Sequence, residues 1–420
     1  MKKFDVIVVG SGASGMMASI SAAQAGASVC LVEKNKKVGK KLLMTGGGRC
    51  NVTNNAPVEE IMNHIIGNGK FLYSAFTQFS NQDIIRFFQD NGVPLKEEDH
   101  GRMFPTTDKS KTIVEALFHK LQSLGVEFLP NAAVQKLLIE NSMIQGVSTE
   151  SELIYAPCVV LSTGGRAYPS TGSTGDGYRL AKSAGHTITT LFATESALIS
   201  SEPFVLEKTL QGISLREVAL SVLDENGKVV VRHQHDLLFT HFGLSGPAAL
   251  RCSSFVNAAL QKGSDSVNVS LDCFPEKSLV ELLSQLTKLA DGKNLRNAFS
   301  SVMQERLLLF FFKKANLDEQ MPAKELTTAQ IEQLASLMKD FRIKIDKTFP
   351  IEKSFVTGGG VNLKEINPKT MESKRCGGLF MSGELLDIHG YTGGYNVTCA
   401  FVTGFVAGKN AAQIASYFDY

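Results

Sequence analysis

The apolar and polar positions of the first fifty residues predict a strand, a turn, a helix and a second strand. Four apolar β-formers, Val6 to Val9, run directly into Gly10-Ser11-Gly12-Ala13-Ser14-Gly15. A helix-compatible stretch follows over residues 16–25, and a second apolar run over residues 28–32 ends at Glu33. This order is typical of the first unit of a dinucleotide-binding fold.

Each glycine of this fingerprint has a physical role. We expect Gly10 to permit the tight turn, Gly12 to let the backbone approach a pyrophosphate, and Gly15 to let the helix pack closely on the strand. The helix N-terminus offers N–H groups and a positive dipole end to the phosphates. Glu33 is placed to accept hydrogen bonds from an adenosine ribose and to repel a 2′-phosphate.

The next part of the chain changes between helical and strand periods. Residues 61–122 are mostly helical in pattern, and a turn-rich stretch over residues 100–110 interrupts them. Residues 125–129, 132–138 and 158–161 read as strands of the same domain. The polar, glycine-rich segment that follows them, residues 168–177, is either a surface loop or a lid over a cofactor or substrate.

Beyond residue 191 short alternating runs appear. Residues 218–223 and 229–231 flank Asp224-Glu225-Asn226-Gly227, which predicts a hairpin. Ser278 with Glu281, and Thr327 with Gln330, have the spacing of capping boxes at helix starts. The all-apolar run of residues 307–312 predicts a buried helix, and residues 341–345 read as a strand that returns to the β-rich part.

The last seventy residues return to glycine-rich chemistry. A buried strand precedes Gly383, and Glu384 and Asp387 follow it. A further cluster, Gly393-Gly394-Tyr395-Asn396, leads into a helix over residues 397–417. We therefore expect a discontinuous first domain of residues 1–190 and 353–420, a β-rich inserted domain of residues 191–274 and 342–352, and a helical module of residues 275–341.

Composition excludes several classes of protein. The 420 residues are 43% apolar and 20% charged with a net charge of +2, which excludes wholesale disorder and disfavours a general nucleic-acid binder that neutralises phosphates. Residues 6–32 carry no charge after Lys2-Lys3, but their glycines make a poor membrane span or signal peptide. No other stretch is apolar enough to cross a bilayer, so we expect a cytoplasmic protein without a membrane partner.

Cysteine and histidine spacing gives no metal site. The seven cysteines are scattered without any Cys-x-x-Cys, which favours reduced thiols in the cytosol over a disulfide framework. His233 and His235 would share one face of a strand, but such an unassisted pair is more typical of a solvated surface than of zinc. We expect no metal.

Two motifs follow Glu33. Residues 34–41 contain five lysines. This composition is typical of a solvated loop, and next to Glu33 it also predicts a positively charged surface around the phosphates of a dinucleotide. Next comes Thr45-Gly46-Gly47-Gly48-Arg49-Cys50-Asn51, where three successive glycines favour close approach of the main chain to something flat or anionic.

The run from Gly39 to Asn51, with Leu238-Phe239-Thr240-His241-Phe242-Gly243-Leu244-Ser245-Gly246-Pro247 later, resembles the bacterial YhiN/BaiN/RdsA-type flavoproteins. That family includes aminoacetone oxidase-like enzymes and a ribosomal RNA dihydrouridine synthase, and the resemblance covers the chain from Asp5 onward. It implies an α/β fold: a Rossmann-like two-dinucleotide-binding-type FAD domain with a discontinuous parallel sheet, a β-rich insertion and a small helical module. It also implies FAD rather than NAD as the cofactor.

The resemblance and the fingerprint together give the expected FAD-binding residues. Ala133 and Val134 offer main-chain groups to adenine, and either Glu384 or Asp387 binds the ribityl chain. The full set is Gly10, Gly12, Ala13, Ser14, Gly15, Glu33, Lys34, Lys41, Thr45, Gly46, Gly47, Gly48, Arg49, Asn51, Ala133, Val134, Thr163, Gly164, Gly165, Gly383, Glu384, Asp387, Gly393, Gly394, Tyr395 and Asn396.

The expected function is that of an FAD-dependent oxidoreductase that cycles hydride between NAD(P)H, flavin and an acceptor. No second dinucleotide fold is predicted, so NAD(P)H would bind transiently over the flavin. Alternatives are an aminoacetone or amine oxidase using O₂, a ribosomal RNA uridine reductase, and a non-enzymatic flavin-binding scaffold. Arg49, Cys50 and His241 are the candidates for residues that face the ring, and packing or cofactor contact is the competing interpretation for each.

An RNA substrate would need a basic approach surface and a deep pocket for a splayed-out base. The sequence leaves open whether the partner is a small molecule or ribosomal RNA, and it does not give the oligomeric state. The candidate basic residues are Arg102, Lys109, Lys111, Arg166, Arg179, Lys339, Arg342, Lys344 and Lys347.

Overall fold

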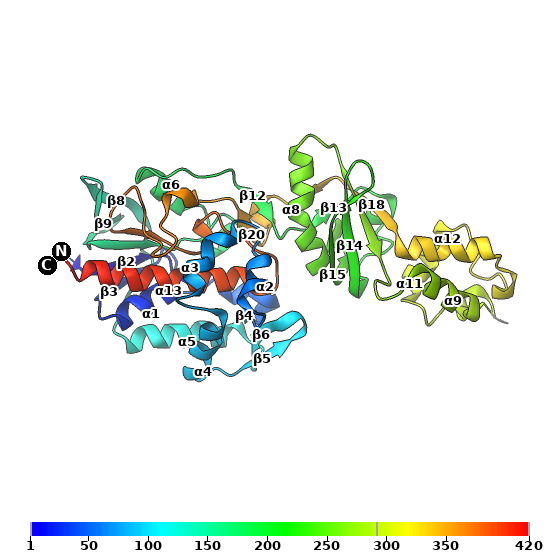
Figure 1. The fold of residues 1–420 in the computed structure, drawn as a ribbon, viewed down its shortest axis with the longest axis horizontal. Coiled ribbons are helices and arrows are strands. Elements are labelled where there is room, and N and C mark those ends of the chain that lie inside the picture. The colour runs from blue at the N-terminus through cyan, green and yellow to red at the C-terminus, as the bar shows by residue number, and fades with distance from the viewer. Residues whose placement is uncertain (1, 291–292, 419–420) are drawn as a thin grey trace. The chain divides into compact units, whose positions relative to one another are not determined.

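A computed structural model describes residues 2–290 and 293–418 (Figure 1). The chain divides into two compact units. Unit 1 comprises residues 1–192 and 351–420, and unit 2 comprises residues 193–350. Unit 1 is therefore built from both ends of the chain.

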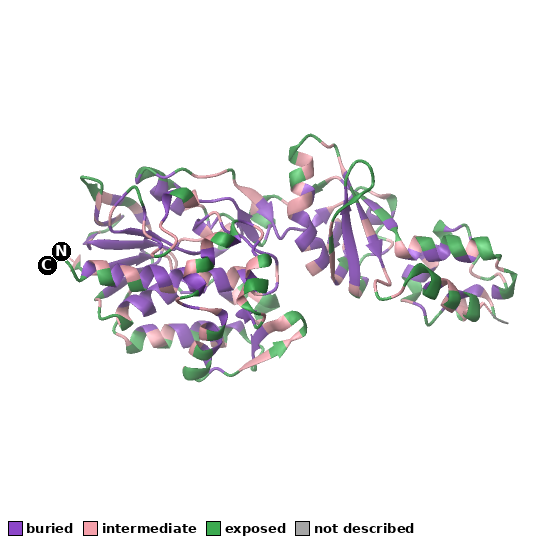
Figure 2. Cartoon of the chain, viewed as in Figure 1, coloured by how far each residue is buried: buried purple, intermediate pink, exposed green. Residues whose placement is uncertain are grey.

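The centre of unit 1 is a five-stranded sheet in the order β21-β11-β2-β3-β7, in which every pairing is parallel. Four of its five strands, β21, β11, β2 and β3, are buried along their whole length, and buried residues are purple in Figure 2. Strands buried on both faces are expected in a doubly covered parallel sheet. The predicted parallel, discontinuous α/β fold is confirmed. The strands are β2 (Val6–Val9), β3 (Val29–Val32), β7 (Glu127–Leu129), β11 (Cys158–Leu161) and β21 (Leu379–Met381).

Two helices from opposite chain ends pack against each other beside this sheet: α1 (Ala13–Gln24) and α13 (Tyr395–Ala415). Their backbones approach closely because α13 carries Gly404 and Gly408 one turn apart. A Cβ at Gly404 would lie 2.3 Å from the carbonyl oxygen of Ser14, and one at Gly408 would lie 2.0 Å from that of Ala18. Neither position has room for a side chain.

Two further sheets complete unit 1. One has the order β1-β10-β9-β8, in which β1 and β10 are parallel and the other pairs are antiparallel. Its strands are β1 (Lys2–Lys3), β8 (Val134–Glu140), β9 (Met143–Thr149) and β10 (Leu153–Tyr155). The other has the order β4-β6-β5, from β4 (Thr53–Asn54), β5 (Leu95–Glu98) and β6 (Arg102–Pro105). A short pair, β12 (Phe192–Thr194) with β20 (Val356–Gly358), lies where the two units join along the chain.

The prediction that residues 61–122 are mostly helical was wrong for the β5–β6 hairpin. The helices in this region are α2 (Val58–Asn63), α3 (Tyr73–Phe76), α4 (Asn81–Asp90) and α5 (Ser110–Ser123). Between α4 and α5 the chain reverses at His100 and Gly101, which have φ angles of 59° and 70°. Left-handed backbone favours glycine and tolerates a polar residue, so the turn signal of this stretch marked a hairpin rather than a helix break.

Unit 2 is organised around a seven-stranded sheet in the order β18-β17-β14-β15-β16-β13-β19. The predicted hairpin is present: β14 and β15 pair antiparallel, and Asp224 Oδ1 accepts from the N–H groups of Asn226 and Lys228 in the turn. Helix α8 (Pro247–Gln261), which starts with proline in its first turn, was not predicted within the β-rich segment. The strands are β13 (Leu198–Ile199), β14 (Ser214–Leu223), β15 (Val229–Phe239), β16 (Gly243–Ser245), β17 (Val267–Asp272), β18 (Phe341–Ile345) and β19 (Lys347–Thr348).

The helical part of unit 2 begins where the sequence placed its capping boxes. Ser278 and Glu281 cap α9 (Leu279–Leu289) reciprocally, and Thr327 and Gln330 cap α12 (Thr328–Lys339). These helices, with α10 (Leu295–Ala298) and α11 (Glu305–Lys314), share one continuous hydrophobic core with the sheet. The separation of a helical module from a β-rich domain stays a prediction. Among the described residues, no helix combines the length and the apolar character that a bilayer crossing requires.

Candidate functional site

A cavity in unit 1 lies at the carboxyl ends of the parallel strands. It contains about 1430 Å³ of space free of atoms, including solvent at its mouth. Its lining residues come from the fingerprint, the end of β3 and the start of α13, which suits a ligand that contacts several elements at once. Fourteen of the predicted FAD-binding residues line it: Gly10, Gly12, Ala13, Ser14, Glu33, Lys34, Lys41, Thr45, Val134, Thr163, Gly164, Gly383, Glu384 and Asn396.

The three fingerprint glycines differ in what surrounds them. Gly10 has a φ of 100°, and a Cβ there would lie 2.6 Å from the carbonyl oxygen of Ser162. A Cβ at Gly15 would lie 1.8 Å from the carbonyl oxygen of Gly10, so helix α1 reaches the strand only because residue 15 is glycine. A Cβ at Gly12 would meet no atom within 4 Å, although it lies on the cavity wall. Packing therefore explains Gly10 and Gly15, whereas the space above Gly12 is open to the cavity.

Glu33 ends β3 with its carboxylate fully engaged. Ser11 donates to Oε2 from its backbone N–H at 2.9 Å and from its hydroxyl at 2.7 Å. Asn35 donates to Oε1 from its backbone N–H at 2.8 Å and from Nδ2 at 2.7 Å. A carboxylate offers about four acceptor positions. The four donors fix its orientation.

An ion pair on the cavity wall joins the two ends of the chain. Lys41 Nζ lies 2.7 Å from Glu384 Oε2, and the backbone N–H of Thr357 donates to the other carboxylate oxygen at 2.8 Å. Asp387, the other acidic candidate, does not line the cavity; Thr189 donates to it, and burial raises the pKa of its carboxyl. Of the two acidic residues, Glu384 is therefore the one placed to contact a ligand.

The turn after β11 contributes a polar group without a protein partner. Thr163 lines the cavity, and its buried hydroxyl makes no hydrogen bond to any described residue. An unpartnered buried hydroxyl is costly unless a ligand or water satisfies it. Gly164 lines the cavity beside it, whereas Gly165 is a packing position, because a Cβ there would lie 2.5 Å from the hydroxyl of Thr357.

The triple-glycine loop borders the cavity through Thr45. Gly46, Gly47 and Gly48 are exposed and have φ angles of 56°, 66° and 87°. A Cβ at Gly47 or Gly48 would meet nothing within 4 Å, so the backbone there is open to a ligand. That these glycines contact a flavin stays a prediction.

The start of α13 is held against the segment that follows this loop. When the side-chain amide of Asn51 is oriented so that its oxygen and nitrogen both form hydrogen bonds, the oxygen accepts from the N–H of Gly394 at 2.9 Å. Asn54 donates to the carbonyl of Gly393 at 3.0 Å. Tyr395 stacks on His64 with ring centroids 4.6 Å apart. Asn51, Gly393, Gly394 and Tyr395 thus position the helix, and Asn396 in its first turn reaches the cavity.

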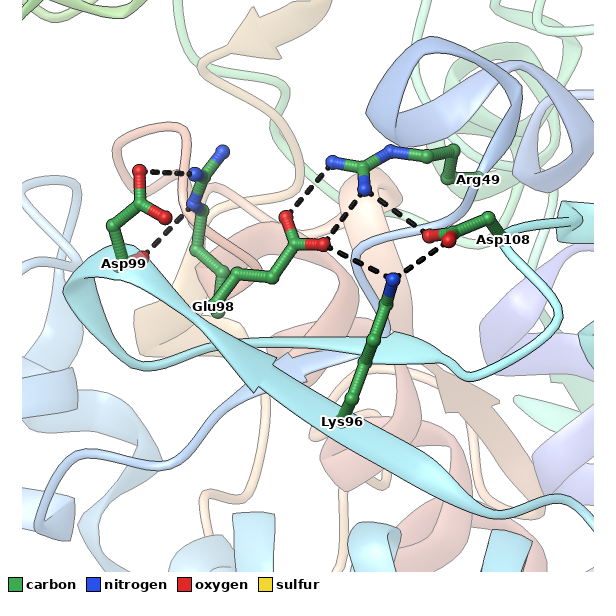
Figure 3. A network of polar contacts seen from close by, with 6 residues as sticks. Arg49, Lys96, Glu98, Asp99 and Asp108 are labelled. Carbon is green, nitrogen blue, oxygen red and sulfur yellow. Dashed lines mark hydrogen bonds and ion pairs between the residues drawn. The ribbon is translucent and has the colours of Figure 1, made fainter.

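Arg49 lies in a network of charges rather than on the cavity wall (Figure 3). Its guanidinium binds both carboxylate oxygens of Glu98 at 2.8 and 3.0 Å and Asp108 at 3.1 Å, and it sits 4.1 Å over the ring of Phe104. Lys96 closes the network at 2.6 Å from Asp108. The hydrogen bond to Glu98 raises the pKa of Arg49. Arg49 therefore anchors the glycine loop to the β5–β6 hairpin.

The other two catalytic candidates are not brought to this cavity wall. Cys50 is fully buried, and burial raises the pKa of its thiol to about 12, so the thiolate nucleophile is absent at neutral pH. His241 belongs to unit 2, in the turn between β15 and β16. Its place at the ring stays a prediction. Ala133 also does not line the cavity, although its neighbour Val134 does.

Sequence reasoning missed several residues of the wall. Ser11 was visible as a fingerprint position but not as a partner of Glu33, and Asn35 was hidden within the lysine-rich run. Four others belong to the loop interpreted as a possible lid. These residues are Ser11, Asn35, Thr171, Gly172, Ser173 and Asp176.

The cavity residues fit a bound dinucleotide. Open space above Gly12 faces the first turn of α1, where unpaired N–H groups and the helix dipole favour phosphate. Glu33, which follows β3, and Thr163 lie on the same wall. Together with the parallel sheet, these features define a Rossmann-type dinucleotide-binding protein.

The chain belongs to the family described as HI0933-like protein Rossmann domain, which matches residues 4–410. It is 30% identical over 419 residues to the ribosomal RNA dihydrouridine synthase of Escherichia coli strain K12, with 98% of each chain covered. It is 29% identical over 415 residues to the 3-dehydro-bile acid delta(4,6)-reductase of Clostridium scindens, covering 97% of this chain and 98% of the relative. The family predicted from the glycine and Leu238–Pro247 motifs is confirmed.

Solved structures share the fold at lower identity. The open conformation of a flavocytochrome c3 fumarate reductase is 20% identical, with a TM-score of 0.54 over 99% of this chain and 79% of that one. A 3-ketosteroid-delta4-(5alpha)-dehydrogenase from Rhodococcus jostii RHA1 is 15% identical, with a TM-score of 0.54 over 98% and 97%. These similarities support the fold assignment.

Proposed function

We propose that the protein uses FAD to reduce a carbon–carbon double bond conjugated to a carbonyl group. The observation that carries the proposal is the cavity, which gathers the fingerprint, Glu33, Glu384 and the start of α13 on one wall. Two relatives that match over nearly their full length are named for such reductions. Uridine conjugates its C5=C6 bond to the C4 carbonyl, and a delta(4,6) 3-dehydro-bile acid conjugates two double bonds to its C3 ketone.

The residues of the wall would hold FAD along its length. The first turn of α1 with Gly12 would bind the pyrophosphate, and Glu33 would bind the adenosine ribose. Thr163 and the Lys41–Glu384 pair would contact the remainder. When bound, FAD supplies two-electron hydride transfer, which side chains alone do not provide.

Two positive features of the wall favour negative charge on the ligand. The first turn of α13, with Asn396 at the cavity, directs the positive end of a helix dipole toward it. Lys41 adds a full positive charge, held in place by Glu384. Such preorganised charges stabilise the electron-rich state of a bound redox group more effectively than mobile solvent does.

Within this reaction class we infer that uridine in ribosomal RNA is the first substrate to test. Relatives with that name occur in two organisms, at 30% identity in Escherichia coli and 27% over 420 residues in Haemophilus influenzae. An RNA substrate also agrees with the expected cytoplasmic location. Five of the nine basic candidates are paired with carboxylates: Arg102, Lys111, Arg166, Lys339 and Arg342. An RNA-binding surface would therefore draw on the other four.

Stopped-flow absorbance of the purified yellow protein tests the redox partners. We expect NADPH or NADH to bleach the flavin and a conjugated carbonyl compound to restore its colour. Bleaching by aminoacetone-like amines, with reoxidation by O₂ alone, would replace the reductase with an amine oxidase. A protein that releases FMN on denaturation, or that binds no flavin after incubation with excess FAD, would refute the cofactor assignment.

Deleting the gene in its own host tests the RNA substrate. We expect the number of dihydrouridines in ribosomal RNA, counted by mass spectrometry, to fall and to be restored by the wild-type gene. An unchanged count in a host without a paralogue would exclude RNA and leave a small conjugated carbonyl compound.

The substitution Gly12→Ala separates cofactor binding from folding. Because a Cβ at this position meets no protein atom and φ is −76°, alanine fits the fold without strain. The added methyl group fills space that we assign to the pyrophosphate, so the FAD dissociation constant should rise at least tenfold, about 1.4 kcal/mol. Thermal unfolding of the apo-protein should shift little. Normal FAD binding by Gly12→Ala would contradict the assigned position of the phosphates.

A further inference from the structure

Two loops that are far apart in sequence meet along one side of the cavity. One follows Glu33 and comprises residues 34–40, and the other comprises residues 168–176, which we call the strap. Lys34 Nζ lies 2.5 Å from Asp176 Oδ2 and 2.6 Å from Thr174 Oγ1. Both loops contribute residues to the cavity wall, so their contacts close the cavity on that side.

Asn35 is the central contact between the loops. Its Nδ2 donates to Glu33 at 2.7 Å and also lies 3.4 Å from the carbonyl oxygen of Thr171 in the strap. Lys40 donates to Asn35 Oδ1 at 3.2 Å and to the carbonyl oxygen of Ser170 at 3.3 Å. One amide therefore touches both the acid that ends β3 and the backbone of the strap.

The backbone of the strap is shaped for this contact. Gly172 has a φ of 105°, and a Cβ there would lie 2.5 Å from Asn35 Nδ2. Any other residue would be strained in conformation and would push the strap away from Asn35. The close approach of the two loops is therefore built into the chain and does not depend on the exposed ion pair alone.

We propose that the strap retains the adenosine half of the bound dinucleotide, and that Asn35 and Lys34 are the positioning residues that hold it closed. The proposal rests on the proposed FAD function. It goes further by assigning the rate of cofactor release to residues outside the fingerprint.

The hydrogen bonds of Glu33 explain how binding and closure are coupled. All four acceptor positions of its carboxylate are occupied by Ser11 and Asn35. A ribose hydroxyl bound to Glu33 would replace the side-chain donor of Asn35 and leave its Nδ2 free to turn to the carbonyl of Thr171. That contact is long at 3.4 Å, so it has room to shorten once Nδ2 no longer donates to Glu33. The ligand thereby strengthens the closure over itself.

The first test measures how fast the holoprotein releases FAD, from the rise in flavin fluorescence after dilution. Lys34→Met keeps most of the side-chain stem and removes the charge, and Asp176→Asn removes the partner charge. We expect either change to accelerate release about 3- to 10-fold, the range for losing one ordinary hydrogen bond at a partly exposed site. Salt should accelerate release from the wild type more than from these variants.

The matched control is Lys2→Met, which breaks a surface ion pair with Glu127 at 3.1 Å in the same unit but away from the cavity wall. It should release FAD at the wild-type rate. If Lys34→Met and Asp176→Asn also do so while wild type and control bind FAD stoichiometrically, the strap is refuted and the FAD function stands. If neither wild type nor control binds FAD, both proposals fall.

Hydrogen exchange gives a second readout that does not depend on activity. FAD should slow amide exchange across residues 168–177 in the wild type. In Asn35→Ala this protection should be reduced, while protection of the first turn of α1 remains. Equal protection of the strap in both proteins would overturn the role of Asn35.

Discussion

The contact between α1 and α13 allows a prediction in which two known effects oppose each other. Replacing Gly408 by alanine in the middle of an exposed helix would stabilise it by about 0.8–1 kcal/mol, because glycine has the poorer helix propensity. Here the new Cβ would lie 2.0 Å from the carbonyl oxygen of Ala18 and 2.7–2.8 Å from its C and Cα atoms. Ordinary contact begins near 3.4 Å, so the deficit is roughly 1.4 Å.

The atoms in the way belong to the backbone, so no side-chain rotation relieves the overlap and the helices must separate. Overpacking of this kind typically costs about 1–3 kcal/mol, and a rigid backbone partner places Gly408→Ala toward the upper end. After the propensity gain is subtracted, we expect a net loss of about 1–2 kcal/mol, or several degrees in Tm at about 2–4 °C per kcal/mol.

The assay is thermal unfolding of the apo-protein followed by circular dichroism, with Lys409→Ala as the control. Lys409 is the exposed neighbour in the same helix, so its substitution reports helix propensity without the clash. Because the first turns of both helices line the cavity, Gly408→Ala should also weaken FAD binding. A rise in Tm for Gly408→Ala would show that propensity outweighs packing and would refute the close contact.

Two further predictions concern His389 and Arg49. Burial lowers the pKa of His389 to about 4, so the unfolded chain takes up a proton below its usual value near 6.5 and the folded chain does not. The free energy of unfolding should therefore fall as pH decreases from about 6.5 to 4, by up to about 3 kcal/mol at 1.36 kcal/mol per pH unit. The urea midpoint should depend less steeply on pH in His389→Gln than in the wild type, and an equal dependence would contradict this prediction. Arg49→Lys loses the two-point contact with Glu98 and should speed amide exchange in the β5–β6 hairpin while costing at most about 1 kcal/mol. A large loss of kcat without faster amide exchange in the hairpin would instead indicate that Arg49 contacts the reacting atoms.

The sequence was most informative where one residue type has one conformational use. The glycines of the fingerprint predicted the turn and close packing that Gly10 and Gly15 show, and the Ser278 and Thr327 boxes marked two helix starts. In each case the signal and its partner lie within a few positions. Local chemistry alone therefore fixed these elements.

The site depends on contacts that no local pattern carries. Lys41 and Glu384 are 343 positions apart, and nothing in either neighbourhood indicates that they pair. The sequence left open whether Arg49 and Cys50 face the ring or pack; in the structure Arg49 contacts Glu98 and Cys50 is buried in the core. The three glycines indicate a loop, but the direction of the Arg49 side chain depends on its contact with the β5–β6 hairpin.

The parallel sheet of unit 1 also has a consequence for synthesis on the ribosome. Strand β11 pairs with β21, and α1 packs on α13, so two neighbours of the first 192 residues are encoded after residue 378. At about 5–20 residues per second, the nascent first segment waits roughly 10–45 s for them, with one sheet edge and one helix face uncovered. Unit 2 is a continuous segment and can complete its fold during that interval. Because Glu384 and Asn396 line the cavity, its wall is complete only after residue 396 has been synthesised.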